Sequence, residues 1–202
     1  MTKSMNKLIL FSVLVFSVAC TNAPMNQVDA HTHVRIGINI PVYPNLVVVP
    51  GYPVYYAPQL DFNFFFYDGL YWVYQDDNWY FSSWYDGPWV FISPQAVPLV
   101  ILQVPVRYYR QPPAHFRGWQ LDKPPHWGDH WGRDWERQRH GWNKPDVGTA
   151  YKPAPLPLYQ RQYPRERYPK KADHQHEIQQ QNYNYEPRDP EVRKYYELQR
   201  RR

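Results

Sequence analysis

The chain has 202 residues and one cysteine, so an intramolecular disulfide is excluded and any fold rests on packing alone. Proline occurs 22 times and, after residue 19, Tyr, Trp and Phe together outnumber Leu, Ile and Val, a composition that argues against one compact domain using the whole chain. The formal net charge of +5 is unevenly divided: residues 20–106 hold one basic residue against six acidic ones, and residues 107–202 hold twenty against twelve.

Residues 1–19 have the pattern of a secretory signal peptide. Lys3 and Lys7 precede an apolar run over residues 8–16, and small residues follow it. The run is too short to span a bilayer as a helix. We therefore expect the protein to be exported to the cell envelope.

The place of cleavage is open. Cys20 stands where a bacterial lipoprotein signal is cut and the cysteine is acylated, which would tether the mature chain to the outer membrane. Ser17 and Ala19 also suit ordinary signal peptidase, and a third cleavage position follows Ala30. An uncleaved anchor is the remaining alternative. All of these place the protein outside the cytoplasm, as an outer-membrane lipoprotein or in the periplasm.

Residues 20–58 are predicted to be an extended lead-in. Between residues 34 and 40, Val and Ile alternate with Arg, Gly and Asn, and this period of two predicts a half-buried strand over 34–40. Five prolines then follow within residues 41–58, so residues 46–49 and 54–56 are expected to form at most short or edge strands.

Residues 59–110 predict an antiparallel β-meander. Aromatic and β-branched residues fill four segments, 64–67, 70–74, 78–83 and 89–92, which are separated by the turn-forming dipeptides Asp68-Gly69, Asp76-Asp77 and Asp86-Gly87. Each aromatic side chain buries roughly 150–250 Å², so these rings can hold a small sheet together. The apolar run over 97–104, either an edge strand or a helical turn, is expected to cover this sheet.

Residues 111–142 form a Trp- and His-rich segment. Trp127, Trp131 and Trp135 recur at helical spacing and Gly141 offers a C-terminal stop, which predicts a short amphipathic helix. Glycines at positions 128 and 132 weaken it by about 1 kcal/mol each relative to alanine.

Residues 143–202 have the composition of a Pro-, Gln- and Arg-rich tail with little apolar surface to offset the entropy of ordering. Within it, Asp189 as cap and Pro190 in the first turn predict a helix over 190–200. The expected fold class is therefore mainly β: a small antiparallel aromatic-rich meander, a short Trp/His-rich helical segment and a largely disordered, basic, Pro-rich C-terminal arm.

Four stretches, residues 34–43, 66–69, 85–89 and 104–110, together with the Trp-Gly pairs, resemble a group of aromatic-rich envelope proteins and lipoproteins of Gram-negative bacteria, loosely akin to those with Trp-x-x-Gly-x-Trp repeats. The resemblance covers most of the chain after the leader, although no clean Trp-x-x-Gly-x-Trp unit occurs. It implies an envelope location and carries no activity over to this chain.

No catalytic pattern stands out in the sequence. A Gly-x-Ser-x-Gly elbow, a phosphate-binding glycine loop, a His-Glu-x-x-His helix and paired cysteines are all absent from it. Asp76 and Asp77 are adjacent in a predicted tight turn, where carboxylates usually face water. We therefore expect a protein that is not an enzyme and uses no cofactor.

Histidines suggest a metal site. His126 and His130 lie four residues apart, which places both imidazoles on one face of a helix. His31 and His33 lie two apart; cleavage after Ala30 would create an N-terminal His31-Thr32-His33 site for Cu(II) or Ni(II). The competing interpretation is that these histidines are ordinary exposed polar residues.

Aromatic and arginine residues suggest polymer binding. The candidates could stack on and pair with anionic glycans such as peptidoglycan or lipopolysaccharide, and they are Arg107, Tyr108, Tyr109, Arg110, Trp127, Trp131 and Trp135. Export argues against nucleic acid as a partner, and the sequence sets no oligomeric state. The sequence thus predicts a non-catalytic structural or binding component of the envelope, with a periplasmic Cu, Ni or Zn protein as the alternative.

Overall fold

A computed structural model describes residues 33–34, 37–144 and 152–200. All of these described residues belong to one compact unit. The predicted signal peptide, Cys20 and His31 lie outside the described residues.

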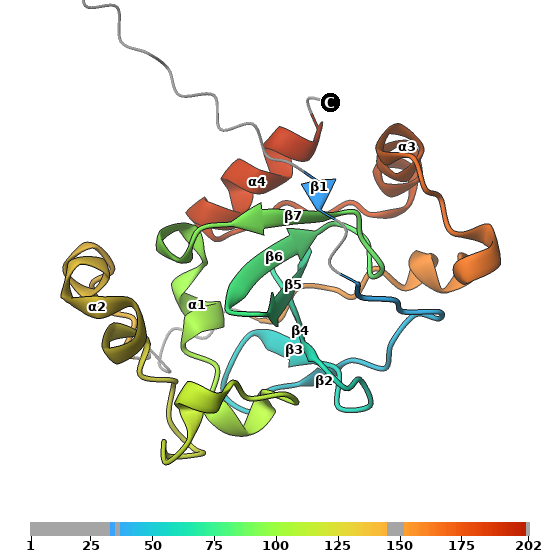
Figure 1. The fold of residues 1–202 in the computed structure, drawn as a ribbon. Helices are drawn as coiled ribbons and strands as arrows, with labels where there is room; N and C mark the ends of the chain where they lie inside the picture. Colours follow the sequence, from blue (N-terminus) through green and yellow to red (C-terminus); the bar gives the residue numbers. More distant parts are fainter. Residues whose placement is uncertain (1–32, 35–36, 145–151, 201–202) are drawn as a thin grey trace, which may run out of the picture. The chain divides into compact units, whose positions relative to one another are not determined.

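One antiparallel sheet organises the described residues (Figure 1). Its seven strands lie in the order β1-β7-β6-β5-β4-β3-β2. Strands β4 to β7 form the predicted meander, the short strands β3 and β2 from the predicted lead-in extend it at one edge, and β1 pairs with β7 at the other. The strands are β1 His33–Val34, β2 Val47–Val48, β3 Val54–Tyr56, β4 Asn63–Tyr67, β5 Leu70–Gln75, β6 Asn78–Ser82 and β7 Trp89–Ile92.

Two of the three predicted tight turns are confirmed. Asp68-Gly69 joins β4 to β5 and Asp76-Asp77 joins β5 to β6, all four residues having positive φ, as a two-residue hairpin turn requires. The third differs, because six residues, 83–88, separate β6 from β7. Asp86-Gly87 therefore lies in a longer loop instead of a two-residue turn.

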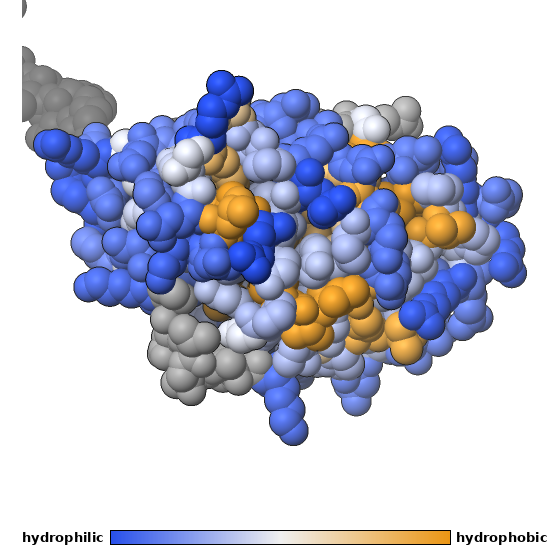
Figure 2. Space-filling model, turned by 90° about the horizontal axis from the view of Figure 1, so that it is seen from below, coloured by the Kyte–Doolittle hydropathy of each residue, from blue (hydrophilic) through white to orange (hydrophobic). Residues whose placement is uncertain are grey.

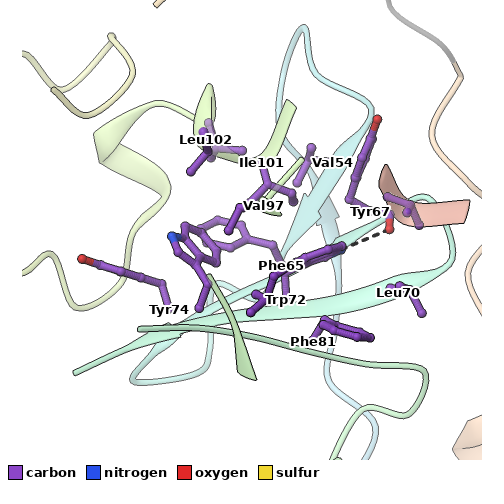
Figure 3. Packing of buried hydrophobic residues seen from close by; sticks show 14 of the residues in the cluster. Val54, Phe65, Tyr67, Leu70, Trp72, Tyr74, Phe81, Val97, Ile101 and Leu102 are labelled. Atoms are coloured by element: carbon purple, nitrogen blue, oxygen red, sulfur yellow. Dashed lines mark hydrogen bonds between the residues drawn. The ribbon is translucent and has the colours of Figure 1, made fainter. Parts of the chain in front are cut away.

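The central strands are buried on both faces of the sheet. Side chains alternate across the pleat, so the aligned residues Phe65, Trp72 and Phe81 face one side while Phe64, Phe66 and Tyr71 face the other. Figure 3 shows Phe65, Trp72 and Phe81 close together beneath Ile101 and Leu102. Neither face of this sheet can be left to water.

The chain after β7 covers the first face. It continues through the helical turn α1 (Leu99–Leu102) to α2 (Trp127–Gln138), and the last helix, α4 (Pro190–Arg200), packs on the same side. The 97–104 run is thus a helical turn that covers the sheet. Tyr195 of α4 lies 4.8 Å from the ring of Phe81, measured between centroids.

The second face is covered by segments from both ends of the unit. Ile40 and Leu46 lie between β1 and β2, whereas Ala154 and Tyr168 follow the last strand, and all four pack in the cluster around Phe64, Phe66 and Tyr71. The predicted strand over 34–40 is wrong for its described end: residues 37–40 are not in a strand, and Gly37 has a positive φ that breaks the extended path.

The described part of the predicted disordered tail is folded. Residues 152–200 contain the 3₁₀ turns Leu158–Gln162 and Arg165–Arg167, the helix α3 (Ala172–Asn182) and α4. The prediction of a disordered arm is wrong for these residues because it did not count the surface that tyrosine rings bury. The rings of Tyr159, Tyr163 and Tyr168 surround the buried Trp84, with centroids 5.5–5.8 Å from its own. Aromatic burial supplies the surface that aliphatic residues lack.

Two buried glutamines bind the tail to the β6–β7 loop. The Gln160 amide donates to the Ser83 carbonyl at 2.9 Å and accepts from the Tyr71 hydroxyl at 3.0 Å. Gln175 donates to the Gly87 carbonyl at 3.0 Å. These side chains satisfy loop groups that no neighbouring strand reaches.

The predicted helix over 190–200 is confirmed with its cap. The Asp189 carboxylate accepts hydrogen bonds from the backbone N–H of Glu191 at 2.8 Å and from the Tyr67 hydroxyl at 3.0 Å. Asp68 of the β4–β5 turn accepts the N–H groups of Arg188 and Asp189, both at 2.8 Å. Burial raises the pKa of Asp68, and these hydrogen bonds oppose that rise.

The face of the molecule drawn in Figure 2 is largely hydrophilic. Figure 2 shows hydrophobic patches that hydrophilic residues separate from one another. Among the described residues, the large apolar side chains that are exposed are Val42, Val47, Val48, Phe91, Leu121 and Leu158.

Replacing Gln160 tests whether the tail is integral to the fold. Gln160→Leu leaves the buried Tyr71 hydroxyl and Ser83 carbonyl without their partner, so we expect it to lower the free energy of unfolding by about 2–5 kcal/mol in urea titrations. The exposed Gln162→Leu is the matched control and should change it by less than about 0.5 kcal/mol. Equal stability of the two variants would mean that the tail does not support the sheet.

Candidate metal centre

The β5–β6 turn supplies the carboxylate of the site. Asp77 has φ 63° and its side chain is about half exposed. The hydroxyl of the buried Tyr74, one strand position away from the turn, donates to Asp77 Oδ1 at 2.5 Å. This hydrogen bond fixes the carboxylate, and burial together with the adjacent carboxylate raises the pKa of Tyr74, so the phenol keeps its proton.

His115 comes from the 3₁₀ turn Ala114–Phe116, which follows two prolines. The buried Asn63 at the start of β4 holds this segment through two hydrogen bonds with the backbone of Gln111, at 2.8 and 2.9 Å. Phe116 is buried against Tyr109 and Trp127. His115 therefore projects from a segment whose backbone is fixed on both sides.

His130 comes from α2, which Trp127 fixes on the sheet. The fully buried indole of Trp127 donates to the Leu102 carbonyl at 2.9 Å and meets the Tyr74 ring edge-on at 5.3 Å. At the other end of α2, Arg139 donates to the carbonyl of Val97. The helix is interrupted at Gly132, whose φ of 85° and ψ of 172° are not helical.

The three side chains converge. His130 Nε2 lies 2.6 Å from Asp77 Oδ1, and the imidazoles of His115 and His130 stack in parallel with centroids 3.7 Å apart. One ligand atom from each residue lies within 4.8 Å of the other two. In the described structure, the buried Nε2 of His115 has no hydrogen-bond partner.

The electrostatics favour a neutral His115. Loss of solvation lowers the pKa of its imidazole, and the neighbouring His130 lowers it further, while Asp77 acts in the opposite sense. A neutral imidazole keeps the nitrogen lone pair that binds a metal ion. The His115 imidazole is therefore suited to bind a metal ion through its neutral form.

Two imidazoles and one carboxylate form a donor set suited to Zn²⁺ and other first-row divalent ions, with a position left for water. Parallel rings direct their lone pairs side by side, so ion binding requires one imidazole to rotate until both nitrogens reach about 2.0–2.1 Å from the metal. The ion would replace the proton between His130 and Asp77. Tyr74 would remain behind the carboxylate as its orienting partner.

The predicted histidine pair is not brought together on one helix face. His126 precedes the first helical residue, Trp127, and has φ −83° and ψ 64°, so the four-residue helical spacing to His130 does not apply. Its ring stacks on Trp119 at 5.0 Å and faces Asp129 at 3.2 Å. The side chain of His33, like the whole of His31, lies outside the described residues.

The predicted polymer-binding residues separate into two groups. Tyr109, Trp127 and Trp135 are buried in the core, so their ring faces are not accessible to a polymer. Arg107 and Arg110 are exposed, and Tyr108 and Trp131 are partly exposed; Arg107 pairs with Asp122. For these four residues polymer binding stays a prediction.

Sequence reasoning missed Asp77 and His115 as ligands. Asp77 has only a turn signal and His115 is an isolated histidine, and the three ligands come from positions far apart in the chain. No spacing pattern could have linked them.

Three comparisons with known proteins, by family model, by sequence and by structure, find no match. Among the described residues, no helix has both the length and the apolar character needed to cross a membrane.

The interruption of α2 distinguishes the structure from the expectation of a continuous helix. A continuous helix would gain stability from Gly132→Ala, whereas φ of 85° predicts a loss of roughly 1–3 kcal/mol in the free energy of unfolding. Urea denaturation, monitored by tryptophan fluorescence, measures the sign of this change in the free energy of unfolding. Arg133→Ala, at the exposed neighbouring position, is the control and should have little effect.

Proposed function

We propose that this protein is an exported, non-catalytic protein of the cell envelope that binds one divalent transition-metal ion through Asp77, His115 and His130. The observation that carries the proposal is the convergence of three ligand atoms around a buried, unpartnered imidazole nitrogen. An unsatisfied buried polar atom has an energetic cost, and a metal ion would remove it.

Export is supported by the leader pattern in residues 1–19 and by the resemblance to Gram-negative envelope proteins. In that compartment no second cysteine of this chain competes for a metal ion, so histidine and carboxylate ligands carry the site. A role in holding or buffering the ion fits this donor set of two imidazoles and one carboxylate.

Metal titration of the purified mature chain tests the proposal. We expect Zn²⁺, Cu²⁺ or Ni²⁺ to bind with one ion per chain near neutral pH and to raise the melting temperature, since an ion that binds only the folded state stabilises it. His115→Ala and His130→Ala should each weaken binding by more than about tenfold, and Tyr74→Phe by about tenfold through the loss of the orienting hydrogen bond.

His126→Ala is the matched control, because His126 lies close in sequence but pairs with Asp129 and not with the cluster. The double variant His31→Ala/His33→Ala removes any N-terminal site and should retain the bound ion. Near-UV circular dichroism establishes that each variant is folded. Absence of stoichiometric binding, or equal binding by the wild type and the folded His115→Ala variant, would contradict the proposal.

A further inference from the structure

A second site lies in the C-terminal segment, where α3, residues 183–186 and Tyr196 of α4 line an open cavity of about 400 Å³. This volume is within the range of small-molecule sites, roughly 300–1,000 Å³. It shares no lining residue with the cluster of Asp77, His115 and His130. The cavity is therefore separate from the metal centre.

Hydrogen-bonding groups that both donate and accept line this cavity. Three amides come from Gln179, Gln180 and Asn184, and an amide offers a carbonyl acceptor beside two N–H donors. Sugar hydroxyls have the same dual character, so amides match them without any net charge. The side chains of Asn184 and Glu186 are exposed and make no hydrogen bond to another described residue, which leaves them available to a ligand.

Three tyrosines supply apolar surface to the same cavity. The rings of Tyr183 and Tyr185 lie 5.7 Å apart between centroids, and Tyr196 joins them from α4. Aromatic rings of this kind pack against the C–H faces of sugar rings while their edges remain polar. Amides, one carboxylate and tyrosine rings thus combine the two kinds of contact that a saccharide needs.

The tyrosine rings are held in place from behind. The Tyr183 hydroxyl donates to the Pro155 carbonyl at 2.6 Å, and the Tyr185 hydroxyl donates to Asp68 at 2.5 Å. Because these rings are already ordered, a ligand that binds them loses little affinity to side-chain entropy. The site is preorganised.

The charge of the lining selects the ligand. Among the described residues that line the cavity there is no Lys or Arg; Glu186 is acidic, and the imidazole of His176 is paired with the Gln180 amide, whose Nε2 lies 2.6 Å from His176 Nε2. Phosphate and carboxylate groups would meet the Glu186 carboxylate without a guanidinium or ammonium group to pair with, which disfavours them. A neutral ligand is the consistent occupant, in contrast to the anionic polymer predicted for the arginine-rich positions.

From this juxtaposition we propose that the cavity between α3 and α4 binds a neutral saccharide, with Asn184 and Glu186 contacting hydroxyl groups and Tyr183 and Tyr185 contacting the sugar ring. The site is independent of the metal centre. In an exported protein it would recognise the uncharged sugar units of an envelope glycan.

Titration of the mature chain with neutral trisaccharides of glucose and of N-acetylglucosamine, followed by calorimetry and saturation-transfer NMR, tests this proposal. We expect binding of at least one of them, unchanged between 50 and 500 mM NaCl because no ion pair contributes. Asn184→Ala should weaken it by about fivefold, the value of one neutral hydrogen bond, and Glu186→Gln by about tenfold, because it replaces a charge-assisted hydrogen bond with a neutral one. Asn143→Ala and Glu166→Gln, exposed residues outside the lining, are the matched controls.

The titration is repeated with EDTA and with His115→Ala, where binding should persist, so that failure of the metal proposal leaves this result intact. No binding of either trisaccharide would overturn the proposal. Binding that is equal in wild type and Asn184→Ala would overturn it as well, as would binding only of a charged polymer such as polygalacturonate with suppression by salt.

Discussion

The fold depends on burying both faces of a short aromatic sheet. Strands β4 to β6 present large rings on each side of the pleat, for example Trp72 on one face and Tyr71 on the other, and both are fully buried. A sheet of five- and six-residue strands cannot cover itself, so each face requires other parts of the chain. The segments before and after the meander cover the two faces, which is why the described residues form one compact unit although the chain is rich in proline.

Proline-rich covering segments need side chains to complete their hydrogen bonds. Because proline has no N–H and favours extended or turn conformations, residues 152–170 add no strand to the sheet. Side-chain hydrogen bonds replace the backbone hydrogen bonds that a further strand would make. Gln160 and Gln175 donate to carbonyls of the loop 83–88 at 2.9 and 3.0 Å, and the Tyr168 hydroxyl donates to the Gly87 carbonyl at 2.6 Å. The covers are therefore attached through specific polar contacts as well as through ring packing.

Both proposed sites form at contacts of the segments that cover the sheet. The metal centre lies where such segments contact the sheet, and the saccharide cavity lies where two of them, α3 and α4, contact each other. At the metal centre the β5–β6 turn contributes Asp77, and the covering segments contribute His115 and His130, which Trp127 and Asn63 hold in register. At the saccharide cavity, the tyrosine hydroxyls are anchored to residues outside α3 and α4, including Asp68 of the β4–β5 turn. Rigid strands and turns thus position side chains that loops alone would leave mobile.

The sequence by itself determined the meander, its two tight turns and the capped helix over 190–200, because these features rest on local rules: alternation along a strand, positive φ in Asp-Gly and Asp-Asp turns, and Asp-Pro at a helix start. Tertiary structure decided the rest. From the sequence, tyrosines in a polar, proline-rich segment predict a solvated arm. In the fold they pack on buried rings of the sheet and its loop, Tyr168 on Trp84 and Tyr195 on Phe81. The meeting of Asp77, His115 and His130 was likewise beyond the sequence, since residues so far apart in the chain approach one another only after the sheet has been covered.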